Sequence, residues 1–201
     1  MKKSFAFACA FLLLAVLCAC VHTPTMDLSG FLLQRKRLGA PLDVMRLYQT
    51  AGDSGCTYFI PLTDNLSLRL LCLTTGEIYE CRVLLRKMNT DGSILTVDSA
   101  MMQSFEQECR NVLCGFGSFS ADEVDVLSHQ LQLSDPAVHR KTGTNTVNLG
   151  HFTVQLQLHP LESVFAVRND WLMETETTLL PESAPLFDDT TATRKETVPH
   201  R

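Results

Sequence analysis

Two stretches of alternating hydrophobicity, on either side of Gly76, constrain the fold of this chain more than any other feature of its sequence. One covers residues 66–72 and the other covers residues 79–86. In both stretches, apolar residues alternate with polar ones such as Arg69 and Arg82. A period of two is typical of strands that bury one face. The sequence therefore predicts an antiparallel hairpin whose apolar side chains share a face.

The turn of this hairpin can be placed in two ways. A two-residue Gly76-Glu77 turn of type II′ has glycine where a positive φ is needed, and it sets Cys72 opposite Cys81. A Thr75-Gly76 turn buries the same face but sets Cys72 opposite Tyr79. Because threonine is poorly suited to a positive φ, the first register is preferred.

Two consecutive helices are predicted after the hairpin. Residues 98–115 carry apolar side chains at helical spacing, with Asp98 or Ser99 as the N-cap. Ser120 and Glu123 form a capping box, which predicts the start of the second helix. The apolar face of the first helix consists of Met101, Phe105, Cys109, Val112 and Leu113.

A second hairpin is predicted near the end of the folded region. Residues 152–158 alternate again, and Pro160 turns the chain into residues 163–168. Strands, then helices, then strands are typical of the α+β class. We therefore expect an α+β fold, with a mainly antiparallel sheet of two hairpins and two consecutive helices packed on one face. The other expected features are a strand opening at residues 31–37, a short helix over 42–49 and a polar loop over 139–150.

The N-terminus has the composition of an export signal. Lys2 and Lys3 precede an uncharged stretch, and Phe5 to Ala19 is an unbroken run of 15 apolar or small residues. This run is shorter than the roughly 20 residues that span a bilayer core as a helix. A basic start followed by such a run is typical of a signal peptide, and an uncleaved membrane anchor is the alternative.

The end of the apolar run, Leu17-Cys18-Ala19-Cys20, resembles the lipobox of bacterial lipoprotein precursors. The resemblance implies that the Cys20 thiol is alkylated with diacylglycerol, that the signal peptide is removed, and that Cys20 becomes the N-terminus. Val21 in the second position implies an outer-membrane destination. Cys18 departs from the family, which more often has a small aliphatic or hydroxyl residue there. Secretion with cleavage near Ala19 or Cys20 is the alternative.

The expected organisation has four parts. They are a signal peptide (1–19), a lipid-anchored tether (20–29), a single α+β domain (30–173) and a disordered Thr/Glu/Pro-rich tail (174–201). Removal of Lys2 and Lys3 leaves 15 of the 17 basic residues against 22 acidic ones, a net charge of −7. This charge argues against a nucleic-acid partner. The one basic cluster, Arg35-Lys36-Arg37, is expected to be solvated or to touch anionic headgroups.

Five of the eight cysteines stay in the expected mature domain, once Cys9 and Cys18 leave with the signal peptide and Cys20 carries lipid. Opposed strand positions bring Cβ atoms close, so we predict a disulfide between Cys72 and Cys81, with two buried free thiols as the alternative. A link from Cys114 to Cys109 or to Cys56 is left open. The spacings match no zinc pattern and contain no C-x-x-C, so neither a metal nor a cofactor is predicted.

No catalytic residue is predicted. The segment Gly115–Phe119 is not a G-x-S-x-G elbow, and His151 and His159 are too far apart in one strand to bind a metal together. These observations favour a lipid-anchored cell-envelope protein that acts as a binding or assembly module, with the membrane and an envelope protein as partners. The alternatives are an envelope hydrolase with an unrecognised active site and a soluble secreted factor.

Overall fold

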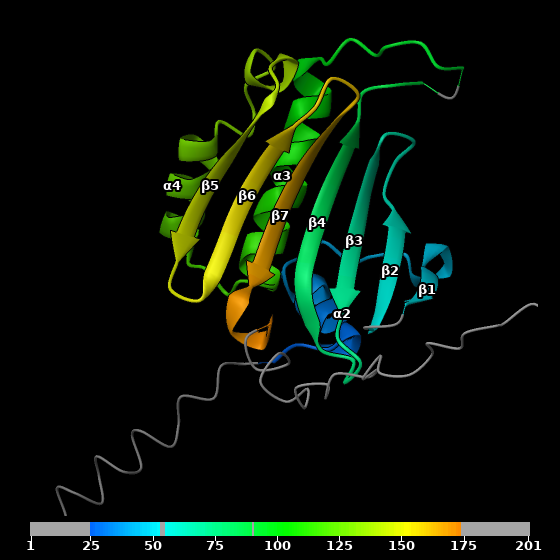
Figure 1. Ribbon diagram of the computed structural model, residues 1–201, viewed down its shortest axis with the longest axis vertical. Helices are drawn as coiled ribbons and strands as arrows, with labels where there is room; N and C mark the ends of the chain where they lie inside the picture. Colours follow the sequence, from blue (N-terminus) through cyan, green and yellow to red (C-terminus); the bar gives the residue numbers. More distant parts are fainter. Residues whose placement is uncertain (1–24, 53–54, 90, 174–201) are drawn as a thin grey trace, which may run out of the picture.

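The computed structural model describes residues 25–52, 55–89 and 91–173 (Figure 1). The predicted signal peptide, the lipidation candidate Cys20 and the predicted tail lie outside the described residues. The elements in chain order are α2 (Leu28–Arg37), the 3₁₀ turn η1 (Val44–Arg46), β1 (Tyr48–Gly52), β2 (Gly55–Pro61), β3 (Leu66–Cys72), β4 (Ile78–Arg86), α3 (Ser99–Gly115), α4 (Ala121–Leu131), the 3₁₀ turn η2 (Val138–Arg140), β5 (Gly143–Leu149), β6 (Phe152–Leu158) and β7 (Glu162–Asn169).

The strands form one seven-stranded sheet in the order β1-β2-β3-β4-β7-β6-β5. Every neighbouring pair is antiparallel, including β4 with β7, which joins the two halves of the chain at the centre. The predicted hairpins are β3–β4 and β6–β7, and each is extended by further strands at its outer side. The α+β prediction with a mainly antiparallel sheet is confirmed.

The helices lie together on one face of the sheet, and the other face carries no helix among the described residues (Figure 1). α3 packs across the two central strands, β4 and β7, and is flanked by α2 and α4. Asp98 caps α3 by accepting a hydrogen bond from the Met101 amide. Both hydrogen bonds of the Ser120–Glu123 capping box are present at the start of α4. The two consecutive helices are therefore where the sequence placed them.

The hydrophobic core fills the space between the sheet and the helices. Alternate residues of the central strands point into it, and Phe105 of α3 meets them from the helical side. Phe31 of α2 and Phe165 of β7 are also fully buried in this core. Burial of large aromatic side chains is among the strongest sources of folding free energy, so these residues hold the helical layer on the sheet.

The prediction of a strand at residues 31–37 is wrong, because this segment is part of α2. Asp27 caps the helix by accepting a hydrogen bond from the Gly30 amide at 2.7 Å. Leu28 and Ser29 belong to the predicted tether, but they are the first residues of the helix. Phe31 and Arg35 lie one turn apart and are both buried, so tertiary packing determines the helical conformation.

The preferred register of the first hairpin is also wrong. Leu70 lies opposite Cys81, and a bulge between Leu71 and Cys72 sets Cys72 opposite Ile78. The turn is a wider one, in which Gly76 takes the positive φ of +89° and no threonine needs it. Cys72 and Cys81 are therefore not directly opposed, and all five described cysteines are free thiols.

Two outer segments differ from the expectations as well. In place of the helix predicted over 42–49, only residues 44–46 form a 3₁₀ turn, and a strand follows from Tyr48. In place of a loop, residues 143–149 form β5, which pairs with β6 along its whole length. Both strands lie at the edges of the sheet and are largely exposed, so they lack the apolar alternation by which the inner strands could be recognised.

Candidate binding site on the open face of the sheet

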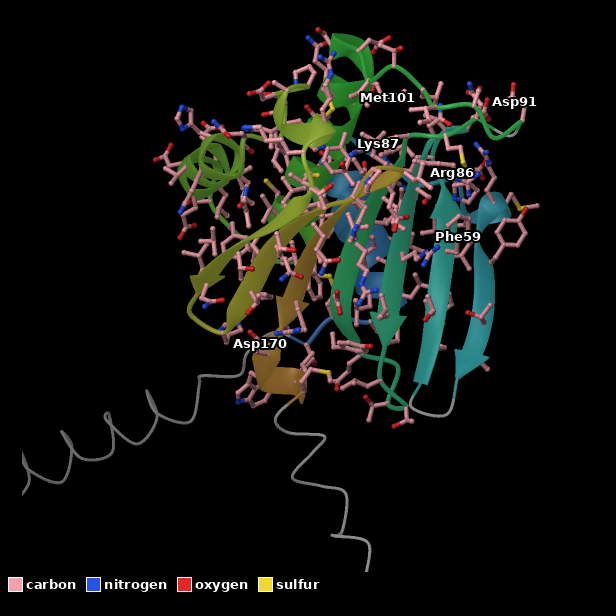
Figure 2. The ribbon with its side chains drawn as sticks, turned by 45° about the horizontal axis from the view of Figure 1, so that its top comes forward. Phe59, Arg86, Lys87, Asp91, Met101 and Asp170 are labelled. Carbon is pink, nitrogen blue, oxygen red and sulfur yellow. The ribbon has the colours of Figure 1, made fainter. Side chains whose placement is uncertain are left out.

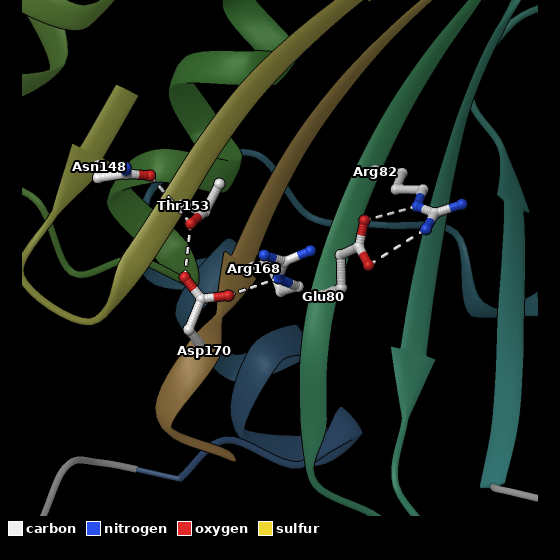
Figure 3. A network of polar contacts seen from close by, with 6 residues as sticks. All are labelled: Glu80, Arg82, Asn148, Thr153, Arg168 and Asp170. Carbon is white, nitrogen blue, oxygen red and sulfur yellow. Dashed lines mark hydrogen bonds and ion pairs between the residues drawn. The ribbon is translucent and has the colours of Figure 1, made fainter. Parts of the chain in front are cut away.

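The open face of the sheet has two ends of different electrostatic character. At the end near the β5–β6 turn, charged side chains neutralise one another (Figure 3). Arg82 donates to Glu80 from both Nε (2.6 Å) and Nη2 (3.2 Å). Arg168 Nε donates to Asp170 Oδ1 at 2.5 Å, and the Thr153 hydroxyl donates to Asp170 Oδ2 at 2.5 Å. This end is an internally satisfied polar network.

The other end of the open face contains a pocket of about 310 Å³. It lies where β2 ends, β3 begins and β4 ends, and we call it the arginine pocket. Figure 2 labels two of its residues, Phe59 and Arg86, on the same side of the molecule. The lining includes Arg46, Phe59, Asp64, Arg69, Leu84, Arg86 and Glu162.

The three arginines of this pocket differ from those of the polar network. Among the described residues, none of Arg46, Arg69 and Arg86 has a carboxylate within ion-pair distance. Arg69 lies over the Phe59 ring, with its guanidinium carbon 5.7 Å from the ring centroid. Guanidinium groups bind carboxylates or phosphates with paired hydrogen bonds, so this arrangement can receive an anionic group.

An exposed apolar edge adjoins the arginine pocket. Val44, Met45 and Tyr48 form what we call the edge patch, in which Met45 is 90% exposed and Tyr48 is 62% exposed. Tyr48 begins β1, the outermost strand on this side, and its ring lies 6.5 Å from that of Phe59 in the pocket. An edge strand has free backbone donors and acceptors on its outer side, which can pair with an added strand.

A second polar cluster is buried between the sheet and the helices. Because the Leu133 carbonyl can only accept, His139 Nε2 donates to it (3.1 Å), and the Ser163 hydroxyl then donates to His139 Nδ1 (2.9 Å). Lys87 (labelled in Figure 2) donates to the backbone carbonyls of His139 and His159. Burial, followed by the nearby Lys87 charge, lowers the pKa of His139 to about 4.

The contact of His139 with Ser163 has the residue types of a base and a nucleophile, but its surroundings do not fit hydrolysis. Both residues are 0% exposed, so a substrate cannot reach the hydroxyl. Nε2 donates to a backbone carbonyl instead of a carboxylate. The cluster instead ties the segment after α4 to the start of β7. The structure therefore gives the hydrolase alternative no support at this cluster.

The predicted site residues are not brought together. Cys20 lies outside the described residues, and Cys72 and Cys81 lie on neighbouring strands without facing each other. His151 and His159 are exposed and lie at opposite ends of β6. Within the described residues, no three His, Cys, Asp or Glu side chains are arranged to hold a metal ion. None of the described helices is long and apolar enough to cross a bilayer.

Sequence reasoning missed both the arginine pocket and the buried histidine. Arg69 and Arg86 occupy polar positions of the two alternating strands, so their common face could have been inferred. Arg46 reaches the pocket from η1, and no local pattern signals that. His139 lies in a polar segment whose burial depends on contacts made by Lys87 and Ser163, far away in the sequence.

Comparisons with known proteins add no relative to this description. No protein-family model matches the chain, and no curated protein and no solved structure matches it either.

Proposed function

We propose that this chain is a lipid-anchored protein of the bacterial cell envelope, and that its domain binds a partner protein through the arginine pocket and the edge patch. The observation that carries the binding role is the set of three guanidinium groups beside an exposed edge strand, none of which has a carboxylate within ion-pair distance in the part of the chain that the structure describes. The observation that supports the location is the Leu17–Cys20 pattern after an apolar run. The partner is then another envelope protein or assembly.

The anchor would keep the domain close to the membrane. Diacylglycerol on Cys20 supplies two acyl chains, which is enough for stable attachment. From Cys20 to the first residue of α2, Leu28, a fully extended chain spans at most about 25–30 Å. A partner that docks on the domain therefore lies near the same membrane surface.

The chemistry of the site favours an extended, acidic segment of the partner. Backbone groups of such a segment would pair with the outer side of β1, while its carboxylates would reach Arg46, Arg69 and Arg86. The exposed apolar side chains of the edge patch would contact alternate residues of the partner's segment. Each charge-assisted hydrogen bond formed in this way adds about 1.5–3 kcal/mol when the partner shields it from water.

Neutralising the arginine pocket is expected to weaken this binding. In the triple variant Arg46→Gln, Arg69→Gln, Arg86→Gln, affinity for an extended peptide of alternating glutamate and valine should fall at least about tenfold, which corresponds to only 1.4 kcal/mol. The measurement is titration calorimetry at two salt concentrations, followed by quantitative pull-down from detergent-solubilised envelopes.

The matched control removes the same charge elsewhere. Lys36→Gln, Arg37→Gln, Arg140→Gln changes three exposed basic residues outside the pocket. This control should keep the affinity of the unmodified protein. Equal binding by the two triple variants, or failure of the unmodified protein to bind acidic peptide or envelope partner, would contradict the proposed surface.

The location is tested separately. The native product is expected to begin at Cys20, with the added mass of a diacylglycerol thioether, and to sediment with membranes. In the Cys20→Ser variant, the added mass of the acyl chains should be absent, and the mature, lipid-anchored protein should no longer be found in the membrane fraction. Intact mass spectrometry with membrane fractionation gives both readouts. A product that starts at another residue without acyl mass, found in the soluble fraction, would instead favour the secreted factor.

A further inference from the structure

Cys56 of β2 and Cys72 of β3 are directly opposed in the sheet. The amide of Leu62, just after β2, donates to the carbonyl of Leu66, the first residue of β3, at 2.9 Å. Hydrogen-bonded and non-hydrogen-bonded pairs alternate along an antiparallel ladder, so every second pair from this contact is hydrogen-bonded. Cys56 and Cys72 are one of these hydrogen-bonded pairs. Hydrogen-bonded pairs have Cα atoms about 5.5 Å apart, within the roughly 4.4–6.8 Å range of disulfides.

The side chains of the two cysteines also interact. Both point to the helical side of the sheet, where Cys72 is buried and Cys56 is half-buried. Burial raises the pKa of the Cys72 thiol to about 12, and the neighbouring Cys56, through its charge and a hydrogen bond, contributes to the rise. A small cavity of about 110 Å³ is lined by both residues, and Cys56 is the partly exposed member of the pair.

The other described cysteines are placed less well for pairing. Cys81 lies opposite Leu70, so its relation to Cys72 is diagonal, and diagonal Cα atoms are about 7–8 Å apart. This exceeds the usual range of a disulfide. Cys109 is fully buried on α3, and Cys114 lies more than one turn further along the same helix.

We propose that Cys56 and Cys72 form a disulfide when the protein meets a disulfide-type oxidant, which makes this pair an oxidative modification site of the sheet. The partly exposed Cys56 reacts first: its thiolate attacks the oxidant and releases one thiolate from it. Cys72 then loses its proton to solvent and attacks the Cys56 sulfur, which releases the second thiolate. Two protein thiols are oxidised by two electrons, and one oxidant disulfide is reduced to two thiols.

The bond would join the outer hairpin, β1–β2, covalently to the rest of the sheet. Closing the chain between two residues in this way restricts the unfolded state, so it stabilises the fold. The inference depends on the register of β2 and β3, and it does not depend on the lipid anchor or on the arginine pocket.

Peptide mapping of the purified full chain tests the proposal. The protein is equilibrated with oxidised glutathione, remaining thiols are alkylated, and trypsin is added. We expect peptide 47–69 to be linked to peptide 70–82, with a mass lower than that of the two reduced peptides by two hydrogen atoms. The midpoint of thermal unfolding should rise by several degrees and return to its initial value on reduction.

Two single variants identify the second cysteine, because Cys72 and Cys81 share one tryptic peptide. Cys81→Ala should keep the link and Cys72→Ala should lose it, while circular dichroism of the reduced variants reports whether each one folds. Should Cys72→Ala misfold, fragmentation of the linked peptides from the unmodified protein still assigns the bond. Free thiols at both Cys56 and Cys72 after oxidation, or a link from Cys56 to Cys81, would overturn the proposal.

Discussion

Replacing Arg35 with alanine is expected to lower the free energy of unfolding by about 3–5 kcal/mol, because the change leaves the Glu108 carboxylate buried without its partner. Arg35 Nη2 donates to Glu108 Oε2 at 2.9 Å, and Nη1 lies 2.8 Å from Oε1. The two side chains are only 3% and 8% exposed. Arg35 Nε also donates to the Ala40 carbonyl, so the same side chain holds the chain that leaves α2.

The measurement is urea unfolding of the single variant, a double variant and a control. Replacing both charges, in Arg35→Met with Glu108→Leu, should recover most of the lost stability, since no unpaired charge stays buried. Arg37→Ala changes an exposed arginine of the same helix and should alter stability by less than about 0.5 kcal/mol. If Arg35→Ala and Arg37→Ala behave alike, α2 does not belong to the cooperative fold.

The parts of the fold that the sequence predicts are those determined by local physics. Period-two alternation identifies β3, β4 and β6, because one face of each strand must be buried. The capping box at Ser120 and Glu123 identifies the start of α4, because it satisfies two amides that the helix itself cannot. The order of these elements is sufficient to predict the α+β class.

Register is harder to predict than strand position. Moving β3 against β4 by two residues keeps every apolar side chain on the same face, so burial cannot distinguish the two registers. Only the backbone conformation of the turn can then distinguish the two registers, and Gly76 can supply a positive φ in either turn. The bulge before Cys72 adds a displacement that no sequence pattern signals. The predicted Cys72–Cys81 disulfide was argued from the register that the structure contradicts. The opposition of Cys72 to Cys56 could not be foreseen without the order of β2 and β3.

Contacts between distant parts of the chain explain the other differences. The sequence predicts that the basic cluster containing Arg35 is solvated. Arg35 is instead buried, and it pairs with Glu108, which lies 73 positions away in the sequence. The arginine pocket likewise combines η1, β3 and the end of β4. Local periodicity carries no information about which charge meets which, so both features emerge only when the sheet is assembled.

Acid is expected to destabilise the protein through His139. The group titrates at about 4 in the folded state, against an ordinary pKa of 6.5. Between these values the unfolded chain binds a proton that the folded protein does not, so the free energy of unfolding falls as the pH falls. The loss amounts to about 3 kcal/mol, is complete near pH 4 and is absent above pH 6.5.

The groups around His139 determine the direction of this effect. Burial disfavours the charged ring, and Lys87 from the end of β4 repels it. The Leu133 carbonyl and Asp135, from the segment after α4, favour the charged ring but do not outweigh burial. The Ser163 hydroxyl donates to Nδ1 of the neutral ring, and protonation of Nδ1 would require this hydrogen bond to reverse its direction.

A pair of histidine variants separates this effect from the titration of carboxylates. His139→Gln keeps an amide donor and an acceptor but cannot be protonated, so its stability should fall by about 3 kcal/mol less than that of the unmodified protein between pH 6.5 and pH 4. His129→Gln changes an exposed histidine and should retain the full pH dependence. Urea unfolding across this range gives the curves. Parallel curves for the unmodified protein and His139→Gln would mean that His139 is protonated as readily in the folded protein as in the unfolded chain.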